Sequence, residues 1–213
     1  MITLQKALQK ALLFVGNDVK RIDITGVRLE CEKGLLYVTA CTAHALYCAE
    51  VQADYPDFSV TITQDFAKAI TKDIAAFSPS SANQFKMFSP YPDWKYIIYP
   101  DRSAQKSKVQ STKFKGYLKK KVALNKFSNY IPLYSTGIKV FENGFNPRKM
   151  ADVRKVITTN TMLEIHHLYK KKMVIKFGTE TVVIMPESNC VYDQTLKVAK
   201  ELFYKLTKGV KNG

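Results

Sequence analysis

Acidic side chains are missing from a long internal stretch of this 213-residue chain, and cysteine is scarce throughout. From Arg102 to Phe141 the chain has ten basic residues and no aspartate or glutamate. The cysteines form no close pair and no zinc-ligand spacing, which excludes a disulfide scaffold and a zinc finger. We interpret all four as reduced packing residues of a cytoplasmic protein: Cys31, Cys41, Cys48 and Cys190.

Long apolar runs and the motifs of common enzymes are also missing. No stretch approaches the roughly 20 apolar residues of a membrane span, and lysines interrupt the N-terminal segment where a secretory signal would be apolar. The sequence has no phosphate-binding loop, dinucleotide fingerprint or zinc-protease motif. The adjacent His166 and His167 would point to opposite faces of a strand. We therefore expect no catalysis, metal or cofactor.

Positive charge, by contrast, is abundant and unevenly placed. The chain has 33 basic and 18 acidic residues, a formal net charge of +15. Residues 1–100 are neutral overall, so the whole excess belongs to residues 101–213. A field this strong and this localised is typical of a protein that faces a polyanion, most often nucleic acid. The alternative interpretation is a solvated basic surface.

Hydrophobic periodicity predicts an α+β protein. Apolar residues at intervals of three and four predict helices, which we place at residues 3–15, 64–76, 146–157 and from 193 onward. β-branched and aromatic runs predict strands, at residues 21–31, 35–41, 45–51, 58–63, 84–88, 94–99, 135–141, 162–168, 172–177 and 181–185. Ser78-Pro79 is interpreted as a break. The acid-free segment 102–126 is interpreted as a basic loop or linker with a short helix near residues 113–121.

Several segments resemble the bacterial sliding clamps, the β subunits of the replicative DNA polymerase. Residues 26–51 read GVRLECEKGLLYVTACTAHALYCAEV, which is similar to a GVxLE strand followed by VATDGHRLAxAEV in the clamps' middle domain. Residues 91–100, YPDWKYIIYP, are similar to the FPDYRRVIP linker motif. In the last clamp domain, the helix resembles FNPRKMADVRKVI at 145–157, and the closing strand resembles VVIMP at 182–186.

The resemblance implies two clamp-like, processivity-fold domains, with helices on one face of antiparallel sheets. Residues 1–100 would form a domain like the clamp middle domain, and residues 101–135 a basic connector. Residues 136–213 would form a reduced version of the last clamp domain with an extra C-terminal helix. The sequence shows no counterpart of the family's first domain, and about one strand pair is missing between residues 75 and 90.

Clamp helices line a pore through which DNA passes, so the resemblance implies that basic residues on the helices face DNA. Lysines on helices make phosphate contacts that do not depend on sequence. Solvated helix faces and a solubilising loop are the alternative interpretations. The candidate DNA-binding residues are Lys6, Lys10, Lys68, Lys72, Arg148, Lys149, Arg154 and Lys155 on helices, and Lys113, Lys115, Lys119, Lys120 and Lys121 in the connector.

Clamps also hold a peptide pocket between two domains, where polymerase and loader tails dock. An apolar groove with prolines and a methionine suits short hydrophobic anchors, whereas plain inter-domain packing is the alternative. Ala43 and Ala45 replace the family's Gly and Arg, which alters the polar rim. Matched by motif, the pocket walls are Ala43, His44, Leu46, Pro92, Ile97, Val183, Met185 and Pro186.

The leading hypothesis is therefore a DNA polymerase processivity factor that encircles or tracks double-stranded DNA. Its partners would be the polymerase and a clamp loader, in the cytoplasm of a bacterium or of a phage-infected host. Clamp rings contain six domain copies, so two per chain favour a trimer. The alternative is a clamp-fold protein that binds DNA directly by charge, as a monomer or open dimer. A DNA-processing enzyme has less support because no carboxylate cluster for Mg²⁺ stands out.

Overall fold

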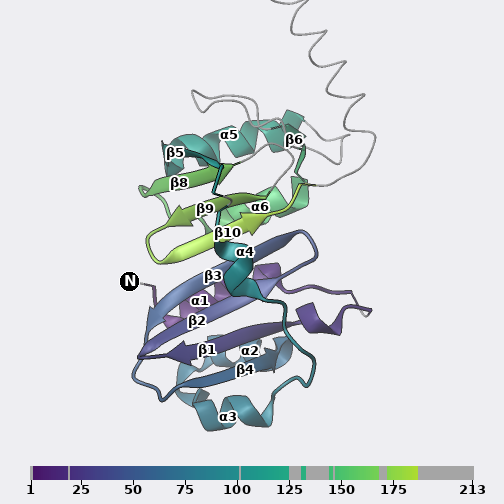
Figure 1. Cartoon of the computed structure of the whole chain (residues 1–213), viewed down its shortest axis with the longest axis vertical. Helices are drawn as coiled ribbons and strands as arrows, with labels where there is room; N and C mark the ends of the chain where they lie inside the picture. The colour runs from purple at the N-terminus through teal and green to yellow at the C-terminus, as the bar shows by residue number, and fades with distance from the viewer. Residues whose placement is uncertain are drawn as a thin grey trace, which may run out of the picture.

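An eight-stranded antiparallel sheet runs through the length of the molecule (Figure 1). The computed structural model describes residues 2–18, 20–100, 102–124, 131–132, 144–145, 147–167 and 172–186. The strands of the sheet are β1 (Gly26–Glu32), β2 (Leu35–Cys41), β3 (Ala45–Gln52), β4 (Phe58–Thr63), β5 (Gln105–Gln110), β8 (Met162–His167), β9 (Met173–Phe177) and β10 (Glu180–Ile184). A separate pair joins β6 (Ile131–Pro132) to β7 (Gly144–Phe145).

The strand order is β4-β1-β2-β3-β10-β9-β8-β5. The two halves of the chain therefore meet at a seam where β3 pairs with β10, with Tyr47 opposite Val182. The order is symmetric about this seam, because each half places a three-strand meander next to it and a separate strand at the far edge. The structure thus builds two similar halves on one continuous sheet.

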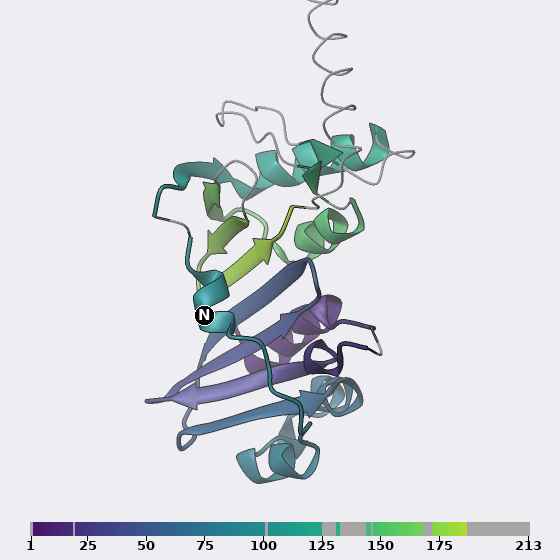
Figure 2. The ribbon, with the colours of Figure 1, turned by 45° about the vertical axis from the view of Figure 1, so that its right-hand side comes forward.

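The helices divide between the two faces of the sheet (Figure 2). One side, here called the helix face, carries α1 (Leu4–Ala11), α2 (Gln64–Lys72), α5 (Ser111–Leu124) and α6 (Pro147–Val156), whose buried side chains share the main core. The opposite side, the outer face, carries the short α4 (Trp94–Ile98) over a second apolar cluster. α3 (Pro79–Gln84) lies at the β4 end.

The predicted α+β fold and most of its elements are confirmed. The strands of both meanders and β4 lie within two residues of their predicted bounds, apart from the start of β1, where Ile22–Ile24 forms a 3-10 turn. α6 is also confirmed, and so are α1 and α2, each of which gives way to a 3-10 turn at its C-terminal end. The predicted strand at 135–141, the final helix and Cys190 lie outside the described residues. The division into domains at residues 100 and 135 stays a prediction.

Within the segment 102–126, strand β5 replaces part of the predicted loop. Helix α5 confirms the short helix predicted near residues 113–121 and is longer than predicted. β5 is an edge strand, so a single apolar residue packed on the main core, Val109, is enough to place it. In α5, Phe114 and Leu118 lie one turn apart and are buried, while the flanking Lys113 and Lys119 are exposed. Two buried anchors hold a helix whose overall periodicity is weak.

The strands predicted at residues 94–99 and 84–88 do not form as predicted. Residues 94–98 form α4, which begins where the Asp93 carboxylate accepts a hydrogen bond from the N–H of Tyr96 at 3.3 Å. Ser78-Pro79 follows the 3-10 turn Ile74–Ala76 and so ends the preceding helical segment as predicted. It also starts α3, because the backbone N–H groups of Ser78 and Ser81 donate to each other's hydroxyls at 2.8 and 3.0 Å. After α3, the predicted strand at 84–88 reduces to one bridge between Lys86 and Ile62.

Candidate nucleic-acid interface and peptide pocket

The four helices of the helix face form two contacting pairs. Gln5 of α1 donates a hydrogen bond from its amide nitrogen to the carbonyl of Thr71 in α2 at 2.8 Å. Lys115 of α5 donates from Nζ to the carbonyl of Ile157, just beyond α6, at 3.0 Å. The pairs lie on the two sides of the seam between β3 and β10. Any polyanion that approached this face would meet side chains from all four helices.

About half of the predicted DNA-binding residues offer a charge that is not paired within the protein. They lie on the helices of the helix face, and in the described part of the chain no carboxylate oxygen lies within 4.0 Å of them. Such cations keep their full attraction for phosphate. They are Lys6, Lys72, Lys113 and Lys119, which are exposed, and Lys149 and Arg154, which are half-buried.

Other predicted contacts are already engaged. Lys68 pairs with Asp65 at 3.3 Å and Lys155 with Asp152 at 3.0 Å, both in exposed pairs three residues apart. These pairs are weak and can exchange partners. The side chains of Lys120, Lys121 and Arg148 lie outside the described residues. The structure therefore places the described members of the predicted DNA-binding set on one face. Some of these side chains are engaged in ion pairs, and others have no carboxylate partner among the described residues.

Lys10 is a special case because its partner is buried. Its ammonium nitrogen lies 2.6 Å from Oε1 of Glu180, and the Tyr47 hydroxyl donates to the same oxygen at 2.6 Å. Burial and the neighbouring carboxylate both raise the pKa of Tyr47, which therefore stays a neutral donor. Through these contacts, Lys10, Tyr47 and Glu180 join α1 to β3 and β10 across the seam. Glu180 has no sequence signal beyond being a lone acid in a strand, and sequence reasoning missed it.

The outer face holds an apolar pocket of about 130 Å³ beside the seam. Six of the eight predicted wall residues line it: Ala43, Leu46, Pro92, Ile97, Val183 and Met185. Three segments far apart in sequence therefore converge as the motifs suggested. The pocket is completed by Arg21, Ile24, Cys41, Thr42 and Ala45, which sequence reasoning did not assign to it.

The remaining two predicted wall residues do not line the pocket. The His44 side chain is exposed, while its carbonyl accepts a hydrogen bond from the N–H of Met185 at 2.8 Å. This contact continues the β3–β10 pairing by one step and holds Met185 at the pocket. Pro186 follows Met185 and is half-buried. His44 thus acts through its backbone, and its imidazole remains free of the pocket.

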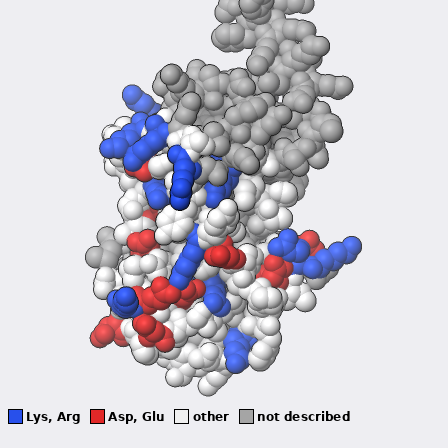
Figure 3. Space-filling model, viewed as in Figure 1, with Lys and Arg blue, Asp and Glu red and all other residues white. Residues whose placement is uncertain are grey.

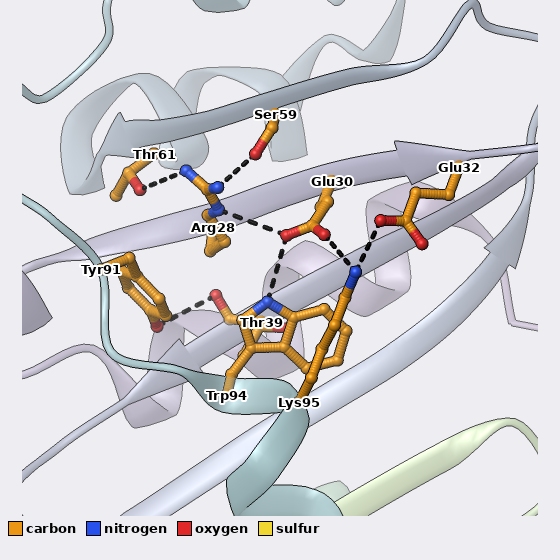
Figure 4. Close-up of polar contacts among 9 residues, drawn as sticks. All are labelled: Arg28, Glu30, Glu32, Thr39, Ser59, Thr61, Tyr91, Trp94 and Lys95. Carbon is orange, nitrogen blue, oxygen red and sulfur yellow. Dashed lines mark hydrogen bonds and ion pairs between the residues drawn. The ribbon is translucent and has the colours of Figure 1, made fainter.

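Helix α4 forms one wall of the pocket and is tied down by polar contacts (Figure 4). The Trp94 indole N–H donates to Oε2 of Glu30 at 3.3 Å, and Lys95 Nζ reaches Oε1 of Glu30 at 2.5 Å and Glu32 at 2.6 Å. Burial acts to raise the pKa of Glu30, but the hydrogen bonds from Lys95 and Trp94 outweigh it and leave that pKa below its ordinary value. At the other end of α4, Lys172 donates to the carbonyl of Ile97 at 2.9 Å.

These observations also limit what the site can do chemically. Trp94 is 4% exposed, so it packs and cannot stack on a nucleic-acid base. Burial raises the pKa of the Cys41 thiol at the pocket and that of Cys48 to about 12, so both stay protonated at neutral pH. Among the described residues, no three His, Cys, Asp or Glu side chains gather as a metal site would require. No helix in the described ranges is long and apolar enough to span a membrane.

The comparisons with known proteins bear on this arrangement. No protein-family model matches the sequence, and no curated protein matches it. Solved structures do match: a putative DNA polymerase III beta subunit from Eubacterium rectale has a TM-score of 0.70 at 16% identity, over 87% of this chain and 63% of that one. The DNA polymerase sliding clamp of Bacillus subtilis has a TM-score of 0.67 at 16% identity, over 87% and 62%.

A third match is the Helicobacter pylori beta clamp bound to a DNA ligase peptide, with a TM-score of 0.65 at 12% identity over 87% of this chain and 63% of that one. The chain spans less than two thirds of the length of these clamps. The resemblance expected from the motifs is thus confirmed as a shared fold. The protein has the sliding-clamp fold on a shorter chain.

Proposed function

We propose that the protein is a processivity factor of the sliding-clamp type, which holds a DNA polymerase on double-stranded DNA. The observation that carries the proposal is that two different kinds of surface lie on the two opposite faces of one sheet. Cations from four helices, with no carboxylate partner among the described residues, lie on the helix face. An apolar pocket built from three distant segments lies on the outer face. A protein that tethers a partner to DNA needs both surfaces, and needs them apart.

On the helix face, DNA binding would be through phosphates. Lys6, Lys72, Lys113 and Lys119 are exposed lysines on helix surfaces, which suits contacts to phosphates that do not depend on sequence. Phosphate contacts of this kind position a duplex without fixing its register, which is what movement along DNA demands. Lys10 is excluded from this set because its ammonium group is held by the buried Glu180.

On the outer face, the pocket would bind a short hydrophobic segment of the polymerase or of a clamp loader. Leu46, Val183 and Met185 provide apolar walls, and Arg21 adds a polar group at the pocket. The Helicobacter pylori clamp, which shares the fold, is bound to a DNA ligase peptide. The role of this protein would be non-enzymatic, since tethering needs no reaction.

A ring of three chains would follow from the two clamp-like halves of each chain. The β4 end of the molecule exposes apolar side chains, since Phe88 is 89% exposed and Phe85 is 47% exposed. The ring of Phe85 stacks on that of Phe66, with 4.3 Å between the ring centroids. An exposed aromatic group of this kind at the end of a sheet suits contact with another copy. The protein would act in the cytoplasm of a bacterium or of a phage-infected host.

The second candidate is a clamp-fold protein that binds DNA by charge as a monomer or open dimer. The net charge of +15 favours it, because a closed ring needs only weak phosphate contacts to stay on DNA. Binding by charge weakens steeply as salt rises, with a log–log slope of about −0.9 per phosphate neutralised. Retention by topology weakens much less.

Retention on nicked circular and linear DNA at moderate salt, together with the mass of the free protein in solution, separates the two candidates. A ring should stay on the circle and slide off the linear ends, and its mass should be a multiple of the chain mass. Equal retention of a monomer on both forms would exclude the ring. Breakdown of DNA by the purified protein with Mg²⁺ would overturn both candidates in favour of an enzyme.

A further inference from the structure

The outer face of the second half carries basic side chains in a regular arrangement. Alternation along the strands sends Val109, Leu163 and Ile165 into the main core, and their neighbours to the outer face. Three lysines from the edge strand β5 and from β9 stand there, and we call them the outer basic patch: Lys106, Lys108 and Lys176.

One carboxylate lies at the centre of this patch. Glu164 of β8 is in register with Lys108 on one side and Lys176 on the other. It is engaged by Lys106, whose Nζ lies 2.7 Å from Oε2, and by His166, whose Nε2 lies 2.5 Å from Oε1. Within the described ranges, no carboxylate oxygen comes within 4.0 Å of the ammonium groups of Lys108 and Lys176. Among the described residues, the patch therefore keeps two charges without a carboxylate partner.

The patch shares its face with the pocket. In the sheet register, the pocket residue Val183 is followed by Val174, His166 and Lys106 on the next three strands. Three strand spacings of about 4.8 Å place Lys106 about 14 Å from the pocket wall. An extended segment of about five residues covers that distance, and about one more would carry it past α4. Both surfaces are within reach of one peptide.

The other half of the outer face differs because it carries several carboxylates. Glu30 and Glu32 lie there, paired with Arg28 and Lys95. Figure 3 shows the carboxylates mainly over the β1 side, where basic side chains lie among them, and basic side chains with few carboxylates toward β5. Such a polar face favours one orientation of a charged partner over the reverse. A nucleic-acid strand carries charge at every nucleotide and would meet the carboxylates of Glu30 and Glu32 where it crossed the β1 side. A protein segment can place its charges at one end alone.

We propose that the outer basic patch binds an acidic segment of the same protein partner whose hydrophobic anchor occupies the pocket. The inference rests on the proposed peptide role of the pocket and adds the chemistry of the partner: an apolar anchor, a spacer of about six residues, and a run of Asp or Glu. The patch then selects partners and their orientation, while the pocket supplies the anchoring contact.

The probes are two synthetic fluorescent peptides that differ only in charge. Each has a Leu-Phe anchor, a glycine-serine spacer of about six residues, and a terminal block of either glutamates or glutamines, made with the block at either end. Fluorescence anisotropy at low salt measures both affinities. The wild-type protein should bind the better glutamate probe about fivefold more tightly than its glutamine twin, as expected for a few exposed ion pairs.

Two double variants with equal loss of charge give the decisive comparison. Lys108→Gln with Lys176→Gln should bring the glutamate preference below about twofold and leave retention on nicked circles unchanged. Lys6→Gln with Lys72→Gln, on the helix face, should keep the preference. An oligothymidine probe that loses more affinity in the first variant than the glutamate probe does would show that the patch binds nucleic acid, and would overturn the inference.

Failure of the inference differs from failure of the proposed function. Equal binding of both probes by the wild-type protein contradicts the patch and leaves the pocket in place. Binding of neither probe contradicts both the patch and the pocket, and retention on nicked circles then decides whether a DNA clamp remains. Loss of that retention with an intact glutamate preference refutes the clamp alone.

Discussion

Lys10 and Glu180 form an ion pair of 2.6 Å that joins the first helix to the last described strand. The two side chains are 22% and 8% exposed, and the Tyr47 hydroxyl shares the same carboxylate oxygen. The pair lies beside the β3–β10 seam, where the two halves of the molecule meet. A lysine that the sequence assigns to DNA thus has a structural partner, and the two roles make different predictions.

Removing Lys10 should destabilise the fold. Lys10→Met leaves the Glu180 carboxylate buried without its cation, which should lower the free energy of unfolding by about 2–3 kcal/mol. Lys6→Met, on the same helix but exposed, should change it by less than about 0.5 kcal/mol. Urea denaturation measures both. A Lys10 variant of unchanged stability that releases DNA would show that Lys10 is a DNA contact after all.

The docking of α4 should weaken in acid. The folded-state pKa of Glu30 lies below its ordinary value of 4.5, so its contribution is present at neutral pH and is lost as pH falls through that lowered pKa. Trp94 is the sole tryptophan, and its emission should shift to the red in the same range. Glu30→Gln should produce the shift at neutral pH, at a cost of about 1–2 kcal/mol.

Glu32→Gln is the control for that experiment, because Glu32 shares Lys95 but does not touch the Trp94 indole. Its tryptophan emission should match that of the wild-type protein. An emission spectrum that is indifferent to pH down to global unfolding would refute the role assigned to Glu30.

A charge on the wall of the pocket should prevent peptide binding. Met185→Asp places a carboxylate among apolar walls, and affinity for the glutamine probe should fall by more than about tenfold. Met162→Asp, at a methionine that is 49% exposed on β8, is the matched control and should bind normally. DNA retention should be the same for both. Unchanged peptide affinity in the Met185 variant would remove the pocket from the proposal.

The free lysines of the helix face should control the salt dependence of DNA binding. Lys6→Gln with Lys72→Gln should lower affinity and make the log–log salt slope shallower by about 1.8, or about 0.9 per lost phosphate contact. Lys108→Gln with Lys176→Gln loses the same charge on the opposite face and should leave the slope unchanged. Equal slopes for the two double variants would mean that only net charge matters.

The aromatic end of the sheet should control assembly. Phe85→Ser with Phe88→Ser removes exposed rings next to β4 and should shift the mass in solution toward a single chain, as measured by light scattering. Tyr96→Ser with Tyr99→Ser removes two exposed rings elsewhere and should leave the mass unchanged. An assembled species that is insensitive to the phenylalanine variant would place the contact between copies at another surface.

The meanders and the helices of the helix face were predictable because their signals are local. Strand β1 to strand β3 and strand β8 to strand β10 are short apolar runs separated by tight turns, and α1 and α6 have clear caps or periodicity. β5 and α4 were not predicted. β5 needs only one apolar side chain, and α4 is a helix built from strand-forming residues and held by the burial of Trp94. Helix α5 was predicted over a shorter range than it has, because only two buried side chains mark it.

The sequence by itself determined the α+β class, the two similar halves, the basic second half and six residues of the pocket, because each rests on composition, on local periodicity or on a motif. Only the tertiary structure decided which charges are free. The ammonium group of Lys10 is held by Glu180, which lies 170 residues away in sequence, and strand pairing alone brings it there. Lys6 on the same helix is exposed. The same pairing separates cations of the helix face from those of the outer basic patch.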